Sequence, residues 1–313
     1  MKNSRWTYIR YFFLNAPKVF LYKLFRRKPR YDRLGKQKKI TLSYSRDVMK
    51  KFIATKKPFA IVRLGGTEIS TLNNYQKIRF KFARKYKKTT KYAMRNNGGF
   101  FPATDENLSF YSQLMFKELG KADVLGISGL HMEDYFHDFY TPKALPIQNW
   151  ALDPLLGEWS SLLKGKRVLI ISPLDQEIQS QYQKRMEIFK ISPNILPGFE
   201  LKTINAVQTI GEEVDERFSN WFAALDYMKM QILKTDFDIA LVGAGVYGTP
   251  LCTYIKDLGK QAIQTGGATQ LLFGIIGKRW ENRDYVTKYI NEHWIHPRYL
   301  PAGYEKIEKG CYW

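Results

Sequence analysis

Hydrophobic and polar positions are distributed along the chain in a pattern that predicts alternating strands and helices. Short apolar runs ending in glycine or serine predict buried strands at residues 58–65, 122–128, 166–172, 238–245 and 260–267. Helical spacing fills the intervals, as in NLSFYSQLMFKEL and NWFAALDYMKMQILK. This alternation indicates an α/β fold: a Rossmann-like, mostly parallel sheet with helices on both faces. Ligands of such folds collect beyond the carboxyl ends of the strands, where these glycine and serine residues fall.

The first 40 residues follow a different pattern. They mix large apolar and aromatic side chains with Lys and Arg, and we expect Pro17 to divide them into two short segments. We therefore predict two parts, a basic aromatic extension over residues 1–40 and an α/β domain over residues 41–313. Basic residues beside Trp, Phe and Leu are typical of a segment that lies on an anionic membrane surface. The alternative is an arm packed on the protein's own surface.

The positive charge is concentrated in the N-terminal third. Residues 1–100 hold 28 Lys and Arg against three acids, whereas the remaining 213 residues hold 22 bases and 26 acids. A field of this kind attracts polyanions such as nucleic acid, anionic lipid or phosphorylated substrates. The two cysteines form no disulfide framework or zinc pattern, and neither a secretory signal nor an apolar run of membrane-spanning length is present. We expect a cytoplasmic protein, peripheral at the inner face of the cell membrane.

The stretch DIALVGAGVYGTPL contains the outline of a dinucleotide fingerprint at Gly243, Gly245 and Gly248. In a dinucleotide site, an acidic residue about 20 residues further on holds the ribose hydroxyls. The corresponding strand end offers Gln264 and Thr265, and no carboxylate. We therefore expect no NAD. The glycines remain compatible with a phosphate-binding turn or with tight packing of a helix on a strand.

A second strand–helix junction lies in KRVLIISPLDQEI. Ser172 is in position to cap the helix, with Pro173 at the first helical residue and Asp175 three residues after the cap. Gln181 and Arg185 lie four residues apart and so share one helix face, from which both can reach a ligand. The alternative is a well-formed helix start with no ligand.

The stretch FAIVRLGGTEIS concentrates the most chemistry. A strand brings Arg63 to its end, Gly65 and Gly66 turn the chain, and Glu68 begins the next helix. Chemistry on a sugar diphosphate needs a cation that holds phosphate and a carboxylate that binds metal or orients a hydroxyl. The alternative is a structural Arg–Glu pair that stabilises the turn.

Two motifs carry a resemblance to a known family. VRLGGTE resembles the RFGDGE-type motif of the GT-D-fold bacterial glycosyltransferases, and IALVGAGVYGTPLCTYIKDLGKQAIQTGG is similar to their C-terminal strand–turn–helix–strand. Together they frame residues 57–270. ILPGFELKTINAVQTI and GGATQLLFGIIGKRW also resemble a group of bacterial polysaccharide-cluster proteins.

The resemblance implies sugar transfer from a nucleotide diphosphate donor, with a DxE motif holding Mn²⁺ or Mg²⁺. Arg63, Gly65 and Glu68 match the family motif, but Gly66 stands in place of its first acid. A lone carboxylate holds such a metal only when the diphosphate and waters complete the coordination shell. Glu68 is therefore a metal ligand, a base or a donor-orienting group.

We hypothesise a glycosyltransferase that acts on a surface-polysaccharide or lipid-linked glycan acceptor, with Glu68 and Arg63 as catalytic residues. The residues assigned to donor or phosphate binding are Gly65, Gly66, Ser172, Arg185, Gly243, Gly245, Gly248, Gly266, Gly267, Gln270 and Arg279. One alternative is a nucleic-acid-binding protein, because QKIRFKFARKYKKTTKYAMR interleaves basic and aromatic residues. The other is a nucleotide-dependent oxidoreductase.

Overall fold

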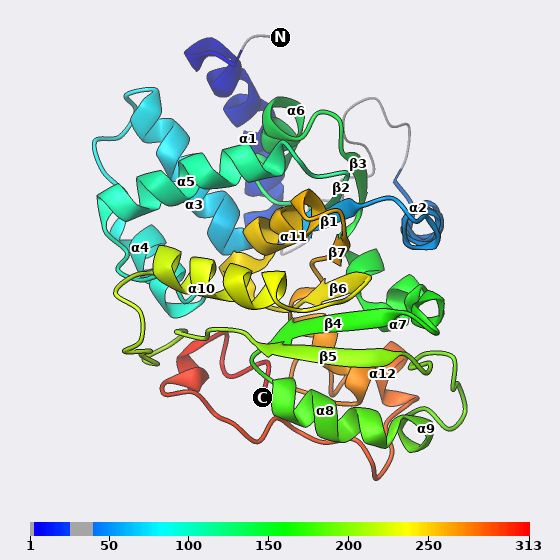
Figure 1. The fold of residues 1–313 in the computed structure, drawn as a ribbon. Helices are drawn as coiled ribbons and strands as arrows, with labels where there is room; N and C mark the ends of the chain where they lie inside the picture. Colours follow the sequence, from blue (N-terminus) through cyan, green and yellow to red (C-terminus); the bar gives the residue numbers. More distant parts are fainter. Residues whose placement is uncertain (1–2, 26–39) are drawn as a thin grey trace.

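The computed structural model describes residues 3–25 and 40–313. Within these ranges, seven strands form one sheet, in the order β3-β2-β1-β7-β6-β4-β5, and all neighbouring pairs are parallel (Figure 1). The predicted parallel α/β sheet is confirmed. The strands are β1 (Phe59–Arg63), β2 (Val124–Ile127), β3 (Leu145–Gln148), β4 (Arg167–Ser172), β5 (Glu200–Asn205), β6 (Ile239–Val242) and β7 (Gln261–Ile263).

The two outermost strands, β3 and β5, were not among the predicted ones. Buried central strands of a parallel sheet are covered on both faces and therefore appear in the sequence as continuous apolar runs. The edge strand β5 has the sequence ELKTIN and is mostly exposed or half-buried, and β3 is the short segment LPIQ. Neither contains the apolar run that identifies a central strand.

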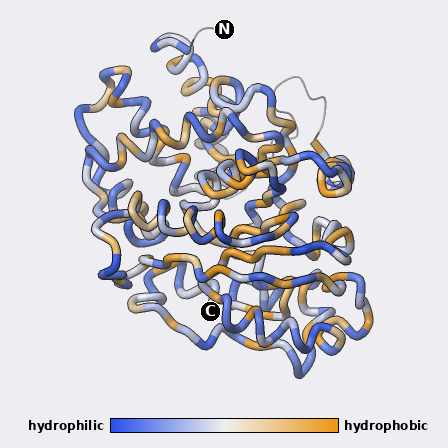
Figure 2. The backbone as a smooth tube through the Cα atoms, viewed as in Figure 1, coloured by the Kyte–Doolittle hydropathy of each residue, from blue (hydrophilic) through white to orange (hydrophobic). Residues whose placement is uncertain are grey.

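Alternate residues of each central strand enter two separate hydrophobic cores. In β1, Ala60 and Val62 face one core, while Phe59 and Ile61 face the other. Figure 2 shows the hydrophobic residues gathered along the strands in the interior. Helices cover both faces, so every central strand is shielded from water.

The two faces carry different helices. The first, which we call the α11 face, is covered by α3 (Gly66–Arg79), α4 (Lys88–Asn96), α5 (Asp105–Leu119), α6 (Glu133–Tyr140), α10 (Trp221–Leu233) and α11 (Gly248–Asp257). The second, the α8 face, is covered by α2 (Leu42–Ala54), η1 (Asn149–Leu152), α7 (Pro154–Gly157), η2 (Ser160–Leu163), α8 (Asp175–Gln183), α9 (Arg185–Ile188), η4 (Gly266–Phe273) and α12 (Asp284–Thr287).

The direction in which the chain leaves each strand creates a crevice at the carboxyl edge of the sheet. After β1, β2 and β6 the chain passes to the α11 face, through α3, α6 and α11. After β3, β4 and β7 it passes to the α8 face, through η1, α8 and η4. Neighbouring segments therefore diverge between β2 and β3, on both sides of β7, and between β6 and β4. Open α/β sheets bind their ligands at such divergence points.

Helix α1 (Arg5–Phe25) runs without interruption through Pro17, so the expected division into two segments is wrong. Pro17 lies on the exposed side of the helix, where water can bind the carbonyl that the proline ring leaves without a donor. The opposite side packs on the body. The Tyr8 hydroxyl donates to Asn73 at 2.6 Å, and Asn15 Nδ2 donates to Asp134 at 3.0 Å.

The rest of the predicted extension, residues 26–39, lies outside the described residues. In the part of the chain that the structure describes, no helix is both long enough and apolar enough to cross a membrane.

Candidate functional site

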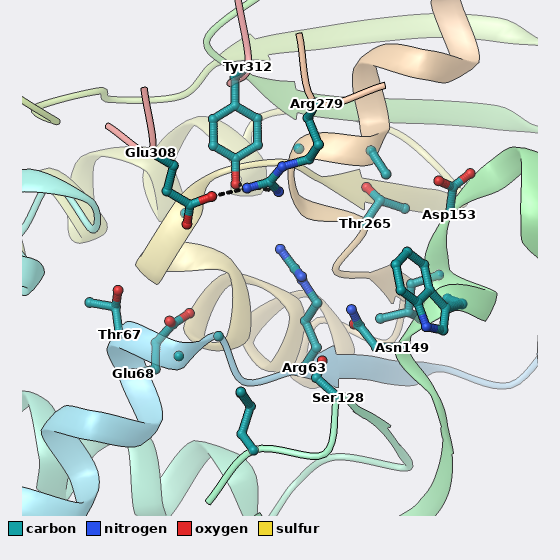
Figure 3. A pocket seen from close by; sticks show the side chains of 18 of the residues that line it. Arg63, Thr67, Glu68, Ser128, Asn149, Asp153, Thr265, Arg279, Glu308 and Tyr312 are labelled. Carbon is teal, nitrogen blue, oxygen red and sulfur yellow. Dashed lines mark hydrogen bonds and ion pairs between the residues drawn. The ribbon is translucent and has the colours of Figure 1, made fainter. Parts of the chain in front are cut away.

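A cleft of about 1350 Å³ opens at the carboxyl edge of the sheet (Figure 3). Its floor is formed by the residues that follow β1, β2, β3 and β7, and its outer wall by the C-terminal segment that carries Arg279 and Tyr312. A smaller hollow of about 140 Å³ adjoins it around the glycine turn after β6, and Arg63 lines both.

Arg63 is the last residue of β1, and its backbone N–H is held by the side chain of the residue that follows β7. Its N–H donates to the side-chain oxygen of Gln264 at 3.0 Å. The guanidinium lies against Gly266, where a Cβ atom would stand 2.2 Å from Nη2. Figure 3 shows this side chain directed into the cleft, and its Nε is buried without a hydrogen-bond partner. An unpaired buried donor on a cation is well suited to an anionic ligand.

Glu68 lies at the third position of α3, which begins after the N-cap residue Gly65. Its side chain turns back beneath Gly65, so that a Cβ atom there would stand 2.5 Å from Oε2. Burial raises the pKa of Glu68, against the backbone hydrogen bonds at Gly65 and Glu68 and the charge of Arg63, which lower it. The Glu68 carboxylate, which turns back to the N-cap residue Gly65, is the carboxylate half of a capping box. Among the described residues, no ion pair joins Glu68 to Arg63. The alternative, a structural Arg–Glu pair that stabilises the turn, therefore has no direct contact to support it.

Gly66 lines the cleft, and a Cβ atom there would meet nothing within 4 Å. The fold therefore leaves room for the acid that the family motif has at this position. Within the described ranges, no group of three or more His, Cys, Asp or Glu side chains is placed to hold a metal ion. Glu68 offers a single carboxylate already engaged by backbone N–H groups, which does not fit a protein-held Mg²⁺ or Mn²⁺.

Arg279 belongs to the opposite wall of the cleft. Its Nη1 donates to the Tyr312 hydroxyl at 3.0 Å, its guanidinium carbon lies 4.3 Å from the centre of the Tyr312 ring, and it forms an ion pair with Glu308 (Figure 3). Tyr312 packs closely because residue 267 is glycine, where a Cβ atom would stand 2.3 Å from the ring. The charges of Arg279 and Arg63 both lower the pKa of Tyr312, against burial, which raises it. The two guanidiniums thus face one site from opposite walls.

The three glycines of the fingerprint have different surroundings. Gly243 lines the smaller hollow, and Gly245, at φ +50°, lines both hollows. Gly248 lines neither, because it packs against the side chain of Gln264, whose nitrogen would stand 2.4 Å from an added Cβ atom. The Gln264 oxygen also accepts from Thr249 at 3.0 Å. The residue at the ribose-binding position is therefore turned into the core, between β1 and α11.

A family model described as a GT-D fold-like domain matches residues 45–272, well over half of the chain. The match spans the strand that carries Arg63, the helix start at Glu68 and the glycine turn after β6. The chain belongs to this family. No curated protein and no solved structure matches it. Because the GT-D-like match ends at residue 272, Arg279 and Tyr312 on the outer wall come from a segment beyond the matched domain.

The remaining candidates lie at the end of β4 or in the helices of the α8 face of this GT-D-like fold. Ser172 lines the smaller hollow, but its hydroxyl accepts from the Leu174 N–H, and α8 begins at Asp175. The predicted cap at Ser172 is therefore wrong, because the first turn is taken up by this local bond. Arg185 lies outside both hollows, with its guanidinium 5.4 Å from the centre of the Tyr182 ring.

The side-chain amides of Gln181 and Gln270 both donate hydrogen bonds to backbone carbonyls. Gln181 donates to His293 at 2.8 Å and is buried. Gln270 lines the smaller hollow and donates to the Tyr312 carbonyl at 3.2 Å. Gln270 therefore supports the C-terminal wall.

Several residues that line the cleft after β3 could not be predicted as site residues from the sequence. Asn149 and Trp150 follow that strand directly, and Asp153 caps α7. Trp150 is 56% exposed although it lies in the cleft wall, and the side-chain oxygen of Asn149 is buried without a partner. Their signal was the Asn–Trp pair directly after LPIQ, which could be recognised only once LPIQ is known to be a strand.

Glu133 organises the loop after β2, which forms another part of the cleft floor. Its carboxylate accepts from the backbone N–H groups of Ser128, Gly129 and Leu130 at 2.8–3.1 Å. Burial raises the pKa of Glu133 to about 7 despite these hydrogen bonds. Glu133 thus holds the loop from behind.

Proposed function

We propose that this protein transfers a sugar from a nucleotide diphosphate donor, and that the donor's diphosphate binds between Arg63 and Arg279. The convergence of these two guanidiniums on one cleft of a GT-D-like domain is the observation that carries the proposal. A planar guanidinium fork matches phosphate geometry better than an ammonium group does. Gly245 and Gly267 add backbone that a phosphate can approach closely.

In the proposed reaction, an acceptor hydroxyl attacks the anomeric carbon while the bond from that carbon to the diphosphate oxygen breaks. The electron pair passes to the leaving diphosphate, whose developing charge Arg63 and Arg279 neutralise. The acceptor proton passes to a base, for which we propose Glu68. Burial raises the pKa of this carboxyl group, and a carboxylate with a raised pKa is a stronger base at neutral pH.

The exposed indole of Trp150 is a flat apolar surface on the wall formed after β3. We propose that it stacks on a ring of the donor or acceptor, because aromatic faces in clefts favour planar or apolar ring faces. Asp153 on the same wall is held by the Leu155 N–H and the Tyr285 hydroxyl. It therefore supports this wall.

In this proposal the acceptor is a surface-polysaccharide or lipid-linked glycan at the cytoplasmic face of the cell membrane. Support comes from the basic N-terminal third, in which residues 1–100 hold 28 bases and three acids. Such a field attracts anionic lipid and phosphate-linked glycans.

The nucleotide class can be tested by thermal unfolding with UDP, GDP, CMP, NAD and a DNA oligomer. A ligand that binds only the folded state raises the unfolding temperature by mass action. We expect a rise with one nucleoside diphosphate and none with NAD. A rise with NAD alone, or no rise with any nucleotide, would refute the proposal.

A further inference from the structure

The outer side of α1 carries a stripe of exposed apolar side chains. Trp6, Phe13 and Phe20 recur every seven residues, close to two helical turns, and are 79%, 67% and 65% exposed. Leu14 beside them is also exposed. The same helix buries Tyr8 on its inner side. Among the described residues, the stripe therefore faces away from the protein's core.

A loop far away in the sequence carries exposed positive charge. Between residues 79 and 88, the exposed side chains include Phe82 and six bases. These bases are Arg79, Lys81, Arg84, Lys85, Lys87 and Lys88. Tyr86 anchors the loop, because its ring is buried and its N–H donates to Asp105 at 2.7 Å. The loop is thus held in place with its charges outward.

The fold joins the helix and the loop into one surface. The Tyr8 ring lies 5.5 Å from Phe80 and 6.0 Å from Phe82 between ring centres. The Arg5 guanidinium lies 4.7 Å from the centre of the Phe82 ring. We call the combined area, the exposed side of residues 5–20 together with residues 79–88, the α1–loop surface.

We propose that the α1–loop surface docks on an anionic lipid bilayer. A bilayer surface offers an anionic headgroup layer, which attracts the bases of the loop. Beneath it lies an apolar layer, which can take up the side chains of the stripe. A nucleic acid would satisfy the bases but leave Leu14 and Phe20 in water. The inference rests on this surface and is independent of the reaction proposed for the cleft.

Helix α1 also contacts the loop after β2, which forms part of the cleft floor. The Phe12 ring lies 5.5 Å from the His131 ring, and the adjacent residue Leu130 lines the cleft.

The test is sedimentation of the full chain with vesicles of phosphatidylglycerol and phosphatidylcholine, compared with pure phosphatidylcholine. We expect binding to the anionic vesicles only, weaker at high salt. The triple variant Trp6→Ser/Phe13→Ser/Phe20→Ser and the double variant Arg84→Ala/Lys85→Ala should each lose binding by about tenfold or more.

Matched controls come from exposed residues elsewhere. Met186→Ser/Ile191→Ser removes exposed apolar side chains, and Lys164→Ala/Lys234→Ala removes two exposed charges. Both should bind vesicles like the wild type. Equal losses in the controls would overturn the proposal. So would vesicle binding that the stripe variant retains, or binding of a DNA oligomer in preference to anionic vesicles. Nucleotide binding by the stripe variant reports on the cleft separately.

Discussion

The Arg63 guanidinium lies against Gly266, with Nη2 only 2.2 Å from the position that a Cβ atom would take. Gly266 also has φ +60°, a conformation that residues with a side chain adopt at a cost. The glycine that follows β7 therefore decides where the cation at the end of β1 can lie.

Gly266→Ala should displace Arg63 and weaken nucleoside diphosphate binding by about tenfold, since one charge-assisted hydrogen bond contributes roughly 1.5–3 kcal/mol. Gly259→Ala is the matched control, because Gly259 has φ +76° and open space around it. Both variants should lose similar stability from backbone strain, and only Gly266→Ala should lose affinity by calorimetric titration. Equal affinities would show that the position of Arg63 is irrelevant to the ligand.

Arg63→Lys and Arg279→Lys should each reduce donor affinity about tenfold while the protein stays folded. Lysine keeps the charge but lacks the planar fork that binds two phosphate oxygens together. Arg185→Lys serves as the control, since Arg185 lies outside both hollows. Titration of the best nucleotide from the thermal screen measures the effect. If the control loses as much as the two cleft variants, the site is misplaced.

Gly66→Asp should give the protein a response to Mn²⁺ that the wild type has only weakly. A side chain at this position meets nothing within 4 Å, and the new carboxylate would stand two residues before Glu68. Two carboxylates bind a divalent cation far better than one does. The measurement is the shift in unfolding temperature with Mn²⁺ in the presence of nucleotide. Gly198→Asp, at another unobstructed glycine, should show no gain.

The raised pKa of Glu133 predicts how stability changes with pH. With a pKa of about 7 in the folded state, against 4.5 for the unfolded chain, the folded protein binds more protons between these values. The free energy of unfolding should therefore fall as pH rises from 4.5 to 7, by up to about 3 kcal/mol from this group. Glu133→Gln should flatten that slope. Denaturant titrations at several pH values give the comparison, and equal slopes would contradict it.

Much of the fold and part of the site could be predicted from local sequence. The central strands are apolar runs, and Arg63 and Glu68 stand on either side of a glycine turn at the end of one of them. Arg279 was recognised as a candidate cation, but its contact with Tyr312 depends on the chain folding back. That return is held by backbone bonds from Lys278 to Trp313, at 3.1 Å, and from Arg279 to Cys311, at 2.9 Å. No local pattern encodes such pairing.

The proposed sugar transfer needs a base, and we propose the Glu68 carboxylate for this role. Glu68→Gln keeps an oxygen that can accept from the Gly65 N–H, so the start of α3 should remain intact. The matched variant Glu118→Gln changes another buried glutamate, on α5, outside the cleft.

The most direct measurement is the release of nucleoside diphosphate from a panel of nucleotide sugars, in the presence of a membrane extract as the source of acceptor. The wild type and Glu118→Gln should consume the same one donor. Glu68→Gln should keep the unfolding temperature of the wild type, but its rate of donor turnover should fall by about 10²-fold or more. Turnover by Glu68→Gln at the wild-type rate, or an unfolded Glu68→Gln protein, would contradict the proposed role of Glu68 as the base. Glu68 would then be a helix cap only.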